Sequence, residues 1–334
     1  MKFNPKNTLY KVVCITKDGK VYDITKGLTS LNWDDQEGEL ARKAMLDIYN
    51  VEVEKNKWLT SIFKLTDKVI IYADVDGQGP KEVLRSAIWE WDYLSSSTKI
   101  LTLLLYEDSF YLTRSEGNFF KGKGKQTKDL VEEIGKQAGI KIDYQFSSIS
   151  HQQVKYQKRK YSDMIKDLLE EVKKETGKKY MMLVEDATLT IKERGGSSNY
   201  VLDVSNTIRT RNKLSKMDMV TKVKVTSSSS KADQEPNIVE EKEKNTAEYG
   251  EIQAVVSQAK KDDKGSAGNE ADNLLKEKAE PEELVEVQAI DYPFLRKGET
   301  VKLKAGNLID TFYILSASHD AKSQTMDLTL ERKK

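Results

Sequence analysis

Short runs of β-branched and aromatic residues, separated by turn signals about every ten residues, dominate the first 120 positions and favour a barrel or sandwich. Hairpins are predicted over residues 10–24, 68–90 and 99–114, and a further strand over 44–54. The first two hairpins each contain an Asp-Gly pair, which supplies the positive φ that a tight turn requires. The amino-terminal part is therefore predicted to be all-β.

Two amphipathic helices are predicted in the middle of the chain. The first is expected to be capped by Thr127 and to end at Gly139, and the second to be capped by Ser162 and to end at Gly177. Threonine and serine are favoured helix caps, and glycine is favoured just after a last turn. A hairpin over 180–192 is expected to follow the second helix, so this region is predicted to be α+β.

The carboxy-terminal part again favours strands, with one helix over residues 269–278. The predicted strands are 221–226, 284–290, 300–304, 311–318 and 324–331. The predicted fold class is mainly β with an α+β insert. Its predicted division is a first barrel domain over 1–120, the insert over 121–200, and a second barrel domain over 201–334.

Charge is balanced over the whole chain, with 55 Lys and Arg against 54 Asp and Glu, but it is uneven locally. Residues 121–224 hold 23 basic and 14 acidic residues, a net charge of +9, whereas residues 227–283 hold 8 and 15, a net charge of −7. The acidic stretch opens with four serines and has almost no large apolar residue before Ile252. Such a composition cannot offset the loss of chain entropy, so 227–248 is predicted to be a flexible acidic loop.

The composition excludes several classes of protein. The single cysteine, Cys14, excludes an internal disulfide and a site built from several thiolates, and it favours folding in a reducing cytosol. There is no apolar run of about 18 residues and no signal-peptide core at the amino terminus, so no membrane partner is predicted. His151 and His319, the two histidines, are expected at surface or turn positions.

The motifs that could carry chemistry each have a simpler explanation. The glycine- and lysine-rich run 121–127 precedes a helix but lacks the spacing of a phosphate-binding loop. The Asp76 turn lacks the remaining ligands of a calcium loop. Glu90 and Asp92 share one face of a strand, where a glycosidase could use them as a carboxylate pair, but solvated charges at a sheet edge are expected instead. No catalytic residue, metal site or cofactor is predicted.

The run 155–161 alternates cations with aromatic rings, a pattern that nucleic-acid-binding surfaces use. A linker that solvates the start of the Ser162 helix is the alternative. The neutral net charge and the lack of a recognisable DNA-reading fold favour it, so specific nucleic-acid binding is not expected.

A resemblance to a known family rests on motifs in order along nearly the whole chain. They are V-L-R-S-A-I-W-E-W-D-Y (83–93), Y-E-D (106–108), E-G-N-F-F (116–120), Y-G-E-I (249–252), K-G-E-T-V (297–301), Y-I-L (313–315), S-H (318–319) and M-D-L-T-L (326–330). These motifs resemble those of phage tail hub proteins of the XkdQ/YqbQ type. Such proteins are grouped with the late control D hubs of contractile tails and phage-tail-like particles. The Trp-Glu-Trp block is the most specific of them.

The resemblance implies a virion structural role with no enzymatic activity. It implies a homotrimer with two tube-type β-barrel domains per chain, which adapts the hexameric tail tube to the trimeric central spike. Its expected partners are the tail tube, central spike and baseplate wedge proteins, with DNA passing through the lumen. The expected location is the baseplate of a phage tail or tail-like bacteriocin, assembled in the bacterial cytoplasm. A tail-associated peptidoglycan hydrolase and a nucleic-acid-binding protein are the alternatives.

Two sets of residues are predicted to contact partners. Sheet edges that a monomer would have to protect can be buried against the next subunit of a ring. The predicted assembly interface contains Tyr49, Val51, Trp89 and Trp91. The clustered positive charge of 121–224 predicts a channel-facing or partner-facing surface formed by Lys121, Lys123, Lys125, Lys158, Arg159 and Lys160.

Overall fold

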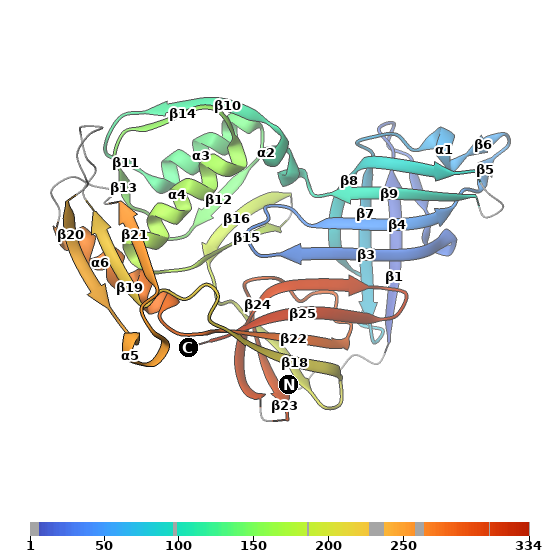
Figure 1. The fold of residues 1–334 in the computed structure, drawn as a ribbon. Helices are drawn as coiled ribbons and strands as arrows, with labels where there is room; N and C mark the ends of the chain where they lie inside the picture. Colours follow the sequence, from blue (N-terminus) through green and yellow to red (C-terminus); the bar gives the residue numbers. More distant parts are fainter. Residues whose placement is uncertain are drawn as a thin grey trace.

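One sheet of 13 strands connects the two ends of the chain (Figure 1). The structure is a computed structural model that describes residues 7–95, 99–185, 187–226, 237–257, 264–306 and 308–333. The fold is mainly β, as the sequence predicts. The elements of the first lobe are β1 (Thr8–Ile15), β2 (Val21–Asp23), η1 (Thr25–Gly27), β3 (Leu28–Gln36), β4 (Lys43–Tyr49), β5 (Glu52–Glu54), β6 (Lys57–Trp58), α1 (Leu59–Ile62), β7 (Lys68–Val75), β8 (Lys81–Leu94) and β9 (Ile100–Tyr106).

The hairpins β1–β2 and β7–β8 confirm two of the sequence predictions. Gly19 has a φ of +80° in the first turn, and Asp76 and Gly77 have φ values of +53° and +73° in the second. These are backbone conformations that glycine adopts readily and aspartate tolerates. The Asp-Gly pairs therefore set both turns.

The prediction for residues 99–114 is wrong in its second half. After β9 the chain forms η2 (Asp108–Phe110) and the short helix α2 (Tyr111–Arg114). Both edges of β9 are already taken by β4 and β8, and the helical turn buries Leu112 in a different core. The predicted strand 44–54 is also interrupted: β4 ends at Tyr49 and β5 begins at Glu52, and between them the Asn50 side chain is hydrogen-bonded to Thr60 of α1.

The strand β3, which the sequence reasoning missed, joins the two lobes. It pairs with β4 on one edge and with β24 (Leu308–Asp320) on the other. Leu31, Trp33 and Asp35 alternate as buried residues along it. The remaining strands of the second lobe are β17 (Ser197–Asp203), β18 (Thr207–Ser215), β22 (Glu282–Ile290), β23 (Thr300–Ala305) and β25 (Thr325–Arg332).

The middle of the chain forms an α+β unit with its own apolar core. Its elements are β10 (Glu116–Lys121), β11 (Lys125–Gln126), α3 (Thr127–Ala138), β12 (Ile142–Gln145), β13 (Ser150–His151), β14 (Val154–Lys160), α4 (Tyr161–Thr176), β15 (Tyr180–Glu185) and β16 (Thr188–Glu193). Both predicted helices and the 180–192 hairpin are present. Gly139 and Gly177 end the helices with φ values near +70°.

The predicted helix caps are wrong by one or two positions. Thr127 and Ser162 lie inside the first turns, because Gln126 and Lys160 occupy the cap positions. Thr127 is buried, and its hydroxyl is hydrogen-bonded within the core. The two side chains therefore serve packing in place of capping.

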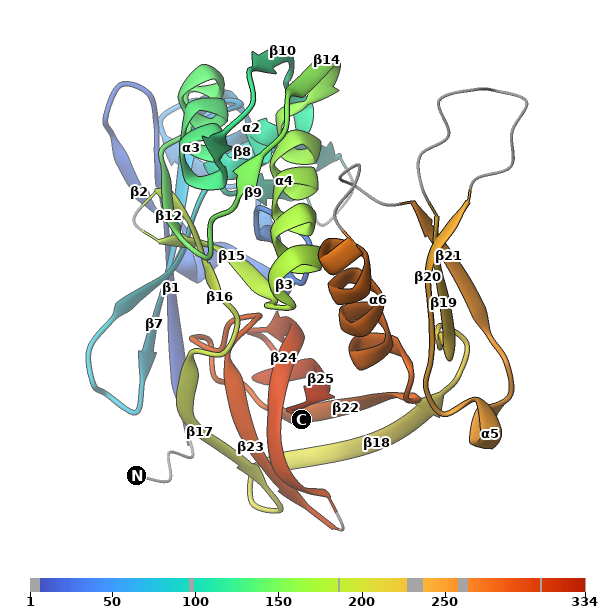
Figure 2. The same ribbon diagram turned by 90° about the vertical axis from the view of Figure 1, so that its left-hand side faces the viewer.

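The segment between β18 and β22 forms a smaller unit with an apolar core of its own. It contains β19 (Lys222–Thr226), β20 (Ile238–Glu243), α5 (Thr246–Tyr249), β21 (Gln253–Ser257) and α6 (Lys264–Lys278). Figure 2 shows α6 between α4 and this small sheet, and α6 contacts both. Of the predicted flexible loop 227–248, residues 227–236 lie outside the described residues, whereas 238–243 form a strand, so the prediction is wrong there. Opposite charges on facing strands, such as Lys222 and Glu241 at 3.1 Å, stabilise a segment that has few apolar residues.

Candidate assembly interface

Eight strands of the large sheet form an uninterrupted antiparallel array that crosses both lobes. Their order is β18-β22-β25-β24-β3-β4-β9-β8. One side of the array packs on the apolar cores of the two lobes. Along each strand, side chains that point into these cores alternate with side chains on the opposite side. In Figure 1 these strands lie one above another, from β8 at the top to β18 at the bottom.

The opposite side of the array is polar over most of its length. Asp47 accepts hydrogen bonds from Ser30 (2.8 Å) and Thr102 (2.6 Å), and Ser318 donates to Asp34 (2.6 Å). Acidic side chains lie on this face in β3, β4, β8, β22, β24 and β25, and its basic side chains include Lys43 and three residues of β18, Arg209, Arg211 and Lys213. The side chains on this polar face include Ser30, Asn32, Asp34, Lys43, Asp47, Glu90, Asp92, Thr102, Arg209, Arg211, Glu286, Gln288, Ser316, Ser318, Asp320, Thr325, Asp327 and Thr329.

An apolar group lies at the end of the polar face. Tyr49 is 48% exposed at the end of β4 and pairs with Ile100, which pairs in turn with Leu94, 61% exposed. Val51 lies two positions after Tyr49, just beyond β4, and is also exposed. Two of the four predicted interface residues thus lie at one end of one sheet. Sequence reasoning missed Leu94, because its place beside Tyr49 depends on the β9 register.

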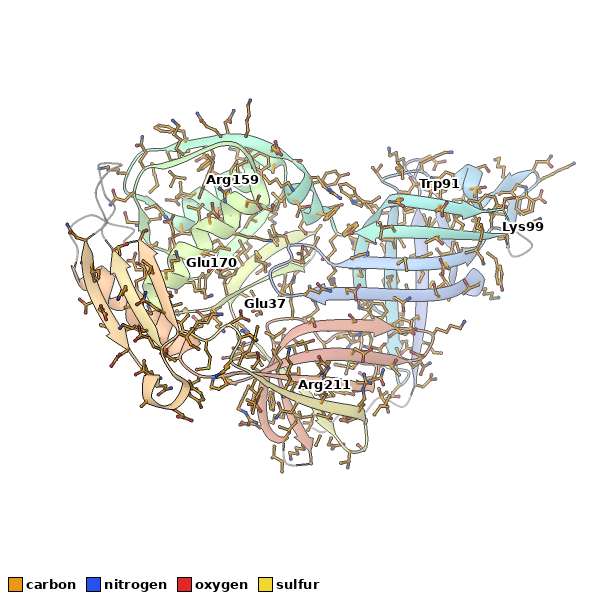
Figure 3. The ribbon with its side chains drawn as sticks, in the orientation of Figure 1. Glu37, Trp91, Lys99, Arg159, Glu170 and Arg211 are labelled. Atoms are coloured by element: carbon orange, nitrogen blue, oxygen red, sulfur yellow. The ribbon has the colours of Figure 1, made fainter. Side chains whose placement is uncertain are left out.

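The two predicted tryptophans have different surroundings. Trp91 is 39% exposed near the free edge of β8 (Figure 3). Trp89 is the extra residue of a β-bulge between Ile88 and Glu90, and it packs against the rings of Phe110 and Tyr111 at 4.8 Å. The ring of Trp89 therefore packs against aromatic residues of its own chain.

The six predicted basic residues lie in two groups at the two ends of the β10–β14 ribbon. Lys158, Arg159 and Lys160 lie at the end where Lys160 faces Glu116, and Lys121, Lys123 and Lys125 lie at and beyond the end where Lys121 faces Val154. Figure 3 labels Arg159 of the first group. Lys121 pairs with Glu133 of α3 at 2.5 Å, and Arg159 pairs with Asp167 of α4 at 2.6 Å. The other four are exposed and form no ion pair within the described residues: Lys123, Lys125, Lys158 and Lys160. Lys121 and Arg159 therefore bind the ribbon to α3 and α4, and the four unpaired lysines make it a basic surface.

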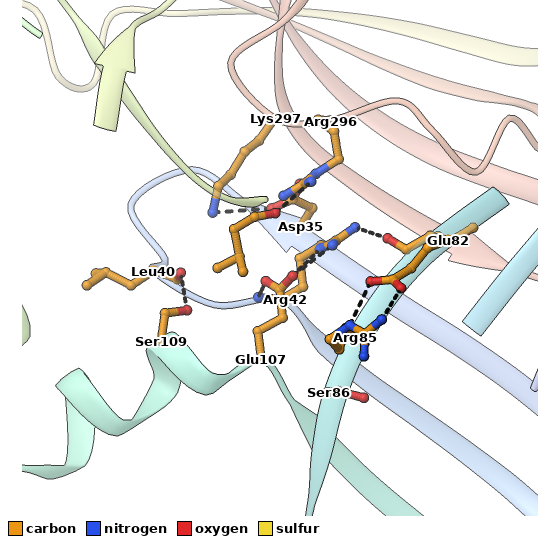
Figure 4. A network of polar contacts seen from close by, with 12 residues as sticks. Asp35, Leu40, Arg42, Glu82, Arg85, Ser86, Glu107, Ser109, Arg296 and Lys297 are labelled. Atoms are coloured by element: carbon orange, nitrogen blue, oxygen red, sulfur yellow. Dashed lines mark hydrogen bonds and ion pairs between the residues drawn. The ribbon is translucent and has the colours of Figure 1, made fainter. Parts of the chain in front are cut away.

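A buried charge network lies where the two lobes and the α+β unit meet (Figure 4). Asp35 is 1% exposed and lies 2.6 Å from Arg296 and 3.2 Å from Lys297. Burial alone would raise the pKa of Asp35, but these two cations and Arg42 hold it well below its usual range. Arg42 binds Glu107 through both its backbone and its guanidinium group. The network therefore fixes the 36–42 connection against the loop that carries Arg296.

Both histidines are buried, so their predicted surface positions are wrong. His319 stacks on Trp33 at 4.7 Å and bonds through Nδ1 to Asp291 at 2.6 Å. His151 lies between Thr127 (2.8 Å) and Glu171 (2.7 Å). Strand alternation turns His319 to the core side, the same side as Ala317.

A cleft of about 210 Å³ lies beside this junction, where α4, β15 and α6 approach the 297–298 loop. Its charged side chains mostly pair with one another: Lys173 with Glu277 at 3.1 Å, and Lys179 with Glu331 at 3.0 Å. Figure 3 places Glu37 and Glu170 in this region, and Tyr180 donates a hydrogen bond to Glu170. These contacts bind the units of the chain to each other.

The described part of the chain contains no cluster of three or more His, Cys, Asp or Glu side chains that could hold a metal ion. No helix within it is long and apolar enough to span a membrane.

Comparison with known proteins finds solved structures with a similar fold. The fold is similar to that of the 43 kDa tail protein of prophage MuSo2 from Shewanella oneidensis, with 13% identity, a TM-score of 0.68, and coverage of 96% of this chain and 98% of the other. It is equally similar to a tail protein of Neisseria meningitidis MC58, with 13% identity, a TM-score of 0.68 and 97% coverage of both chains. A third similar structure is the E. coli c3393 protein, with 12% identity, a TM-score of 0.58, and coverage of 92% and 74%.

The c3393 protein is described as a type VI secretion component with structural similarity to the T4 tail proteins gp27 and gp5. Comparison with curated protein sequences finds no match. A family model described as YQBQ-like matches residues 31–331, which span both lobes and the units between them. The chain belongs to the YQBQ-like family.

Proposed function

We propose that this protein is the structural hub of a contractile phage tail or tail-like particle, without catalytic activity. In this role three copies form a ring that joins the hexameric tail tube to the trimeric central spike. The observation that carries the proposal is the eight-strand array, in which both lobes contribute four strands each to one sheet. Three such chains would present six similar four-strand units, which matches a hexameric tube on one side and a threefold spike on the other.

The polar face of the array suits the wall of a channel in that ring. Its hydroxyl, amide and carboxylate groups stay hydrated, and its acidic groups repel the phosphate backbone of nucleic acid. DNA could therefore pass without being bound. The expected location is the baseplate of the particle, with wedge proteins outside the ring.

Co-expression of the tagged chain with the tail tube and spike proteins tests the proposed role. Both proteins should be retained with the chain after purification. Retention of neither protein, by a chain that is folded by circular dichroism, would contradict the role.

Changing Tyr49 to aspartate should prevent assembly while leaving the fold intact. Tyr49 is half exposed beside Ile100, so the new carboxylate is solvated in the monomer and desolvated only at a contact. Circular dichroism should be unchanged, and a pull-down with tube and spike proteins should fail. Val255→Asp, at a 61% exposed position of the small sheet, is the control for an added surface carboxylate and should assemble. Normal assembly of the Tyr49 variant would place Tyr49 outside the interface.

The basic ribbon is proposed to dock an acidic surface of a neighbouring baseplate protein. Changing Lys158, Arg159 and Lys160 together to glutamate should reduce particle yield and infectivity or killing activity. It should change the free energy of unfolding by less than about 1 kcal/mol, because the Arg159–Asp167 pair is exposed. Lys302→Glu with Lys304→Glu, two exposed lysines of β23, is the control for added negative charge. Unchanged yield and activity in the triple variant would show that the ribbon contacts no partner.

A further inference from the structure

We propose that the small unit formed by β19, β20, α5, β21 and α6 is hinged, and that a polar contact between α6 and α4 holds it over one mouth of the proposed channel. Its place at the channel rests on the proposed homotrimeric hub, whereas the hinge is a property of the single chain. Release of the polar contact lets the unit swing away from the mouth.

The small unit is attached to the large sheet at one place. It is inserted between β18 and β22, and Ser215 at the end of β18 pairs directly with Glu282 at the start of β22. The two chain segments that leave the sheet therefore start side by side and form a single stem. On one of these segments, residues 216–218 are exposed and lie outside any strand or helix. A few residues between elements can absorb the backbone rotation of a hinge, so a stem of this kind permits the whole unit to turn.

The small unit has an apolar core that it does not share. Val223, Val225, Ala271, Leu275 and Ala279 are buried in it, and this cluster is separate from the cores of the two lobes and of the α+β unit among the described residues. The apolar side of α6 therefore faces its own small sheet. Rotation about the stem would leave this core intact.

The contact that holds the small unit in place is polar. α6 packs on α4, which is the main contact of the unit with the rest of the chain (Figure 2). Asn273 and Glu277 lie four positions apart and share one face of α6. Asn273 donates a hydrogen bond to the carbonyl of Lys174 at 2.9 Å, and Glu277 pairs with Lys173 at 3.1 Å. Gly177 at the end of α4 permits this approach, because a Cβ there would lie 2.9 Å from Oδ1 of Asn273.

Water reaches this polar contact. The side chains of Lys173 and Glu277 are 26% and 29% exposed, and both line the cleft of about 210 Å³ between α4, β15 and α6. Ion pairs in such surroundings contribute little to stability and are screened by salt, whereas an apolar core is not. The position of the small unit is therefore held more weakly than its fold.

The small unit lies on the polar side of the eight-strand array. The core of the second lobe lies between β17 and the array, because Tyr200 and Leu202 of β17 pack with Val285 and Val287 of β22. Figure 2 shows β17 on one side of β22, β24 and β25 and the small unit on the other. Figure 1 shows the small unit beyond one end of the array. In a ring whose channel is lined by the polar face, three such units would project inward at one mouth and narrow it.

The distance between two spin labels tests the hinge in the free chain. The labels are attached to cysteines at Gln253, exposed in β21, and at Lys136, exposed in α3; the native Cys14 is fully buried. The wild type should give one distance at low salt, and a second, longer distance should grow at high salt because the ion pair is screened. Glu277→Lys brings a like charge to Lys173 and should give the longer distance already at low salt.

Exchange of the pair, Lys173→Glu with Glu277→Lys, should restore the shorter distance. Glu248→Lys, an exposed position in α5, makes the same charge change away from α4 and should keep the shorter distance. An unchanged single distance in Glu277→Lys, or no recovery on exchange, would overturn the hinge. Loss of hydrogen-exchange protection in β19 of the Glu277 variant would show that the unit unfolds instead of turning, and would overturn the hinge as well.

Cross-linking in the assembled ring tests the place of the small unit at the mouth. Gln253→Cys alone, assembled with tube and spike proteins and treated with a flexible bis-maleimide, should give covalent dimers and trimers of the chain, because three small units converge there. Lys136→Cys is the control and should give none, since Figure 2 shows α3 on the far side of α4 from the small unit. Equal cross-linking of the two variants in an assembled ring would contradict the placement.

The two experiments separate this inference from the proposed function. A wild type that stays monomeric with both partners present overturns the hub, while the spin labels still decide whether the unit is hinged. A ring that forms from a chain with one fixed label distance at every salt concentration leaves the hub in place and overturns the hinge.

Discussion

Replacing Asp35 with asparagine is expected to lower the free energy of unfolding by about 3–5 kcal/mol, because it leaves buried cations without their counter-charge. The carboxylate lies between Arg296 and Lys297, and Lys297 is itself buried. Asparagine keeps the volume of the side chain but supplies no negative charge. Urea denaturation followed by tryptophan fluorescence measures the loss, since Trp33 lies two residues away on the same strand.

The Asp35 variant should also respond differently to acid. The pKa of Asp35 is lowered in the folded chain, so its contribution is fully present above the unfolded value of about 3.9 and is lost as pH falls toward the folded value. Below about pH 4 the wild type should therefore lose stability more steeply than Asp35→Asn. Asp108→Asn, which breaks an exposed pair with Lys68, is the matched control and should cost less than about 1 kcal/mol. Equal losses in the two variants would show that the Asp35 network does not stabilise the junction.

Proline at Ile314 should be the second strongly destabilising change. Ile314 is fully buried in β24, its backbone N–H donates to Glu299 at 2.9 Å, and its carbonyl accepts from Gly298 at 2.7 Å. Proline removes the donor from a strand with neighbours on both edges, and should cost about 3 kcal/mol or more.

The expected result for Ile314→Pro is loss of cooperative thermal unfolding in the second lobe and loss of ring formation with it. Ile314→Val, which keeps the backbone donor, should cost only about 0.5–1.5 kcal/mol and should still assemble. A proline variant with the melting temperature of the valine variant would mean that β24 is not a central strand.

The parts of the fold that local chemistry determines could be predicted from the sequence. The Asp18-Gly19 and Asp76-Gly77 turns set two hairpins, and the spacing of apolar residues with Gly139 and Gly177 set two helices. The carboxy-terminal strands followed from their alternation. In each case the neighbouring residues along the chain carry the signal.

Features that depend on distant partners could not be predicted in this way. β3 mixes Asn32, Asp34 and Asp35 with its apolar residues, and the buried Asp35 is compensated by cations more than 250 positions away. His319 is buried because it is hydrogen-bonded to Asp291 and stacks on the ring of Trp33. β20 is a strand because lysines of β19 face its glutamates. Composition indicates solvent exposure for Asp35 and His319 and an irregular loop at β20, and only contacts with residues distant in the sequence reverse these indications.

The candidate interface was predicted in part for the same reason. Exposed aromatic residues such as Tyr49 and Trp91 could be chosen by type, but the place of Leu94 and the distribution of charges on the polar face depend on sheet order. Trp89 is drawn inward by a bulge that the sequence does not indicate.

The mass of the assembled chain tests the central claim most directly. Light scattering of the purified 38.1 kDa chain, mixed with its tail tube and spike proteins, should give a complex that contains three copies of the chain. A chain that remains monomeric with both partners present would contradict the account.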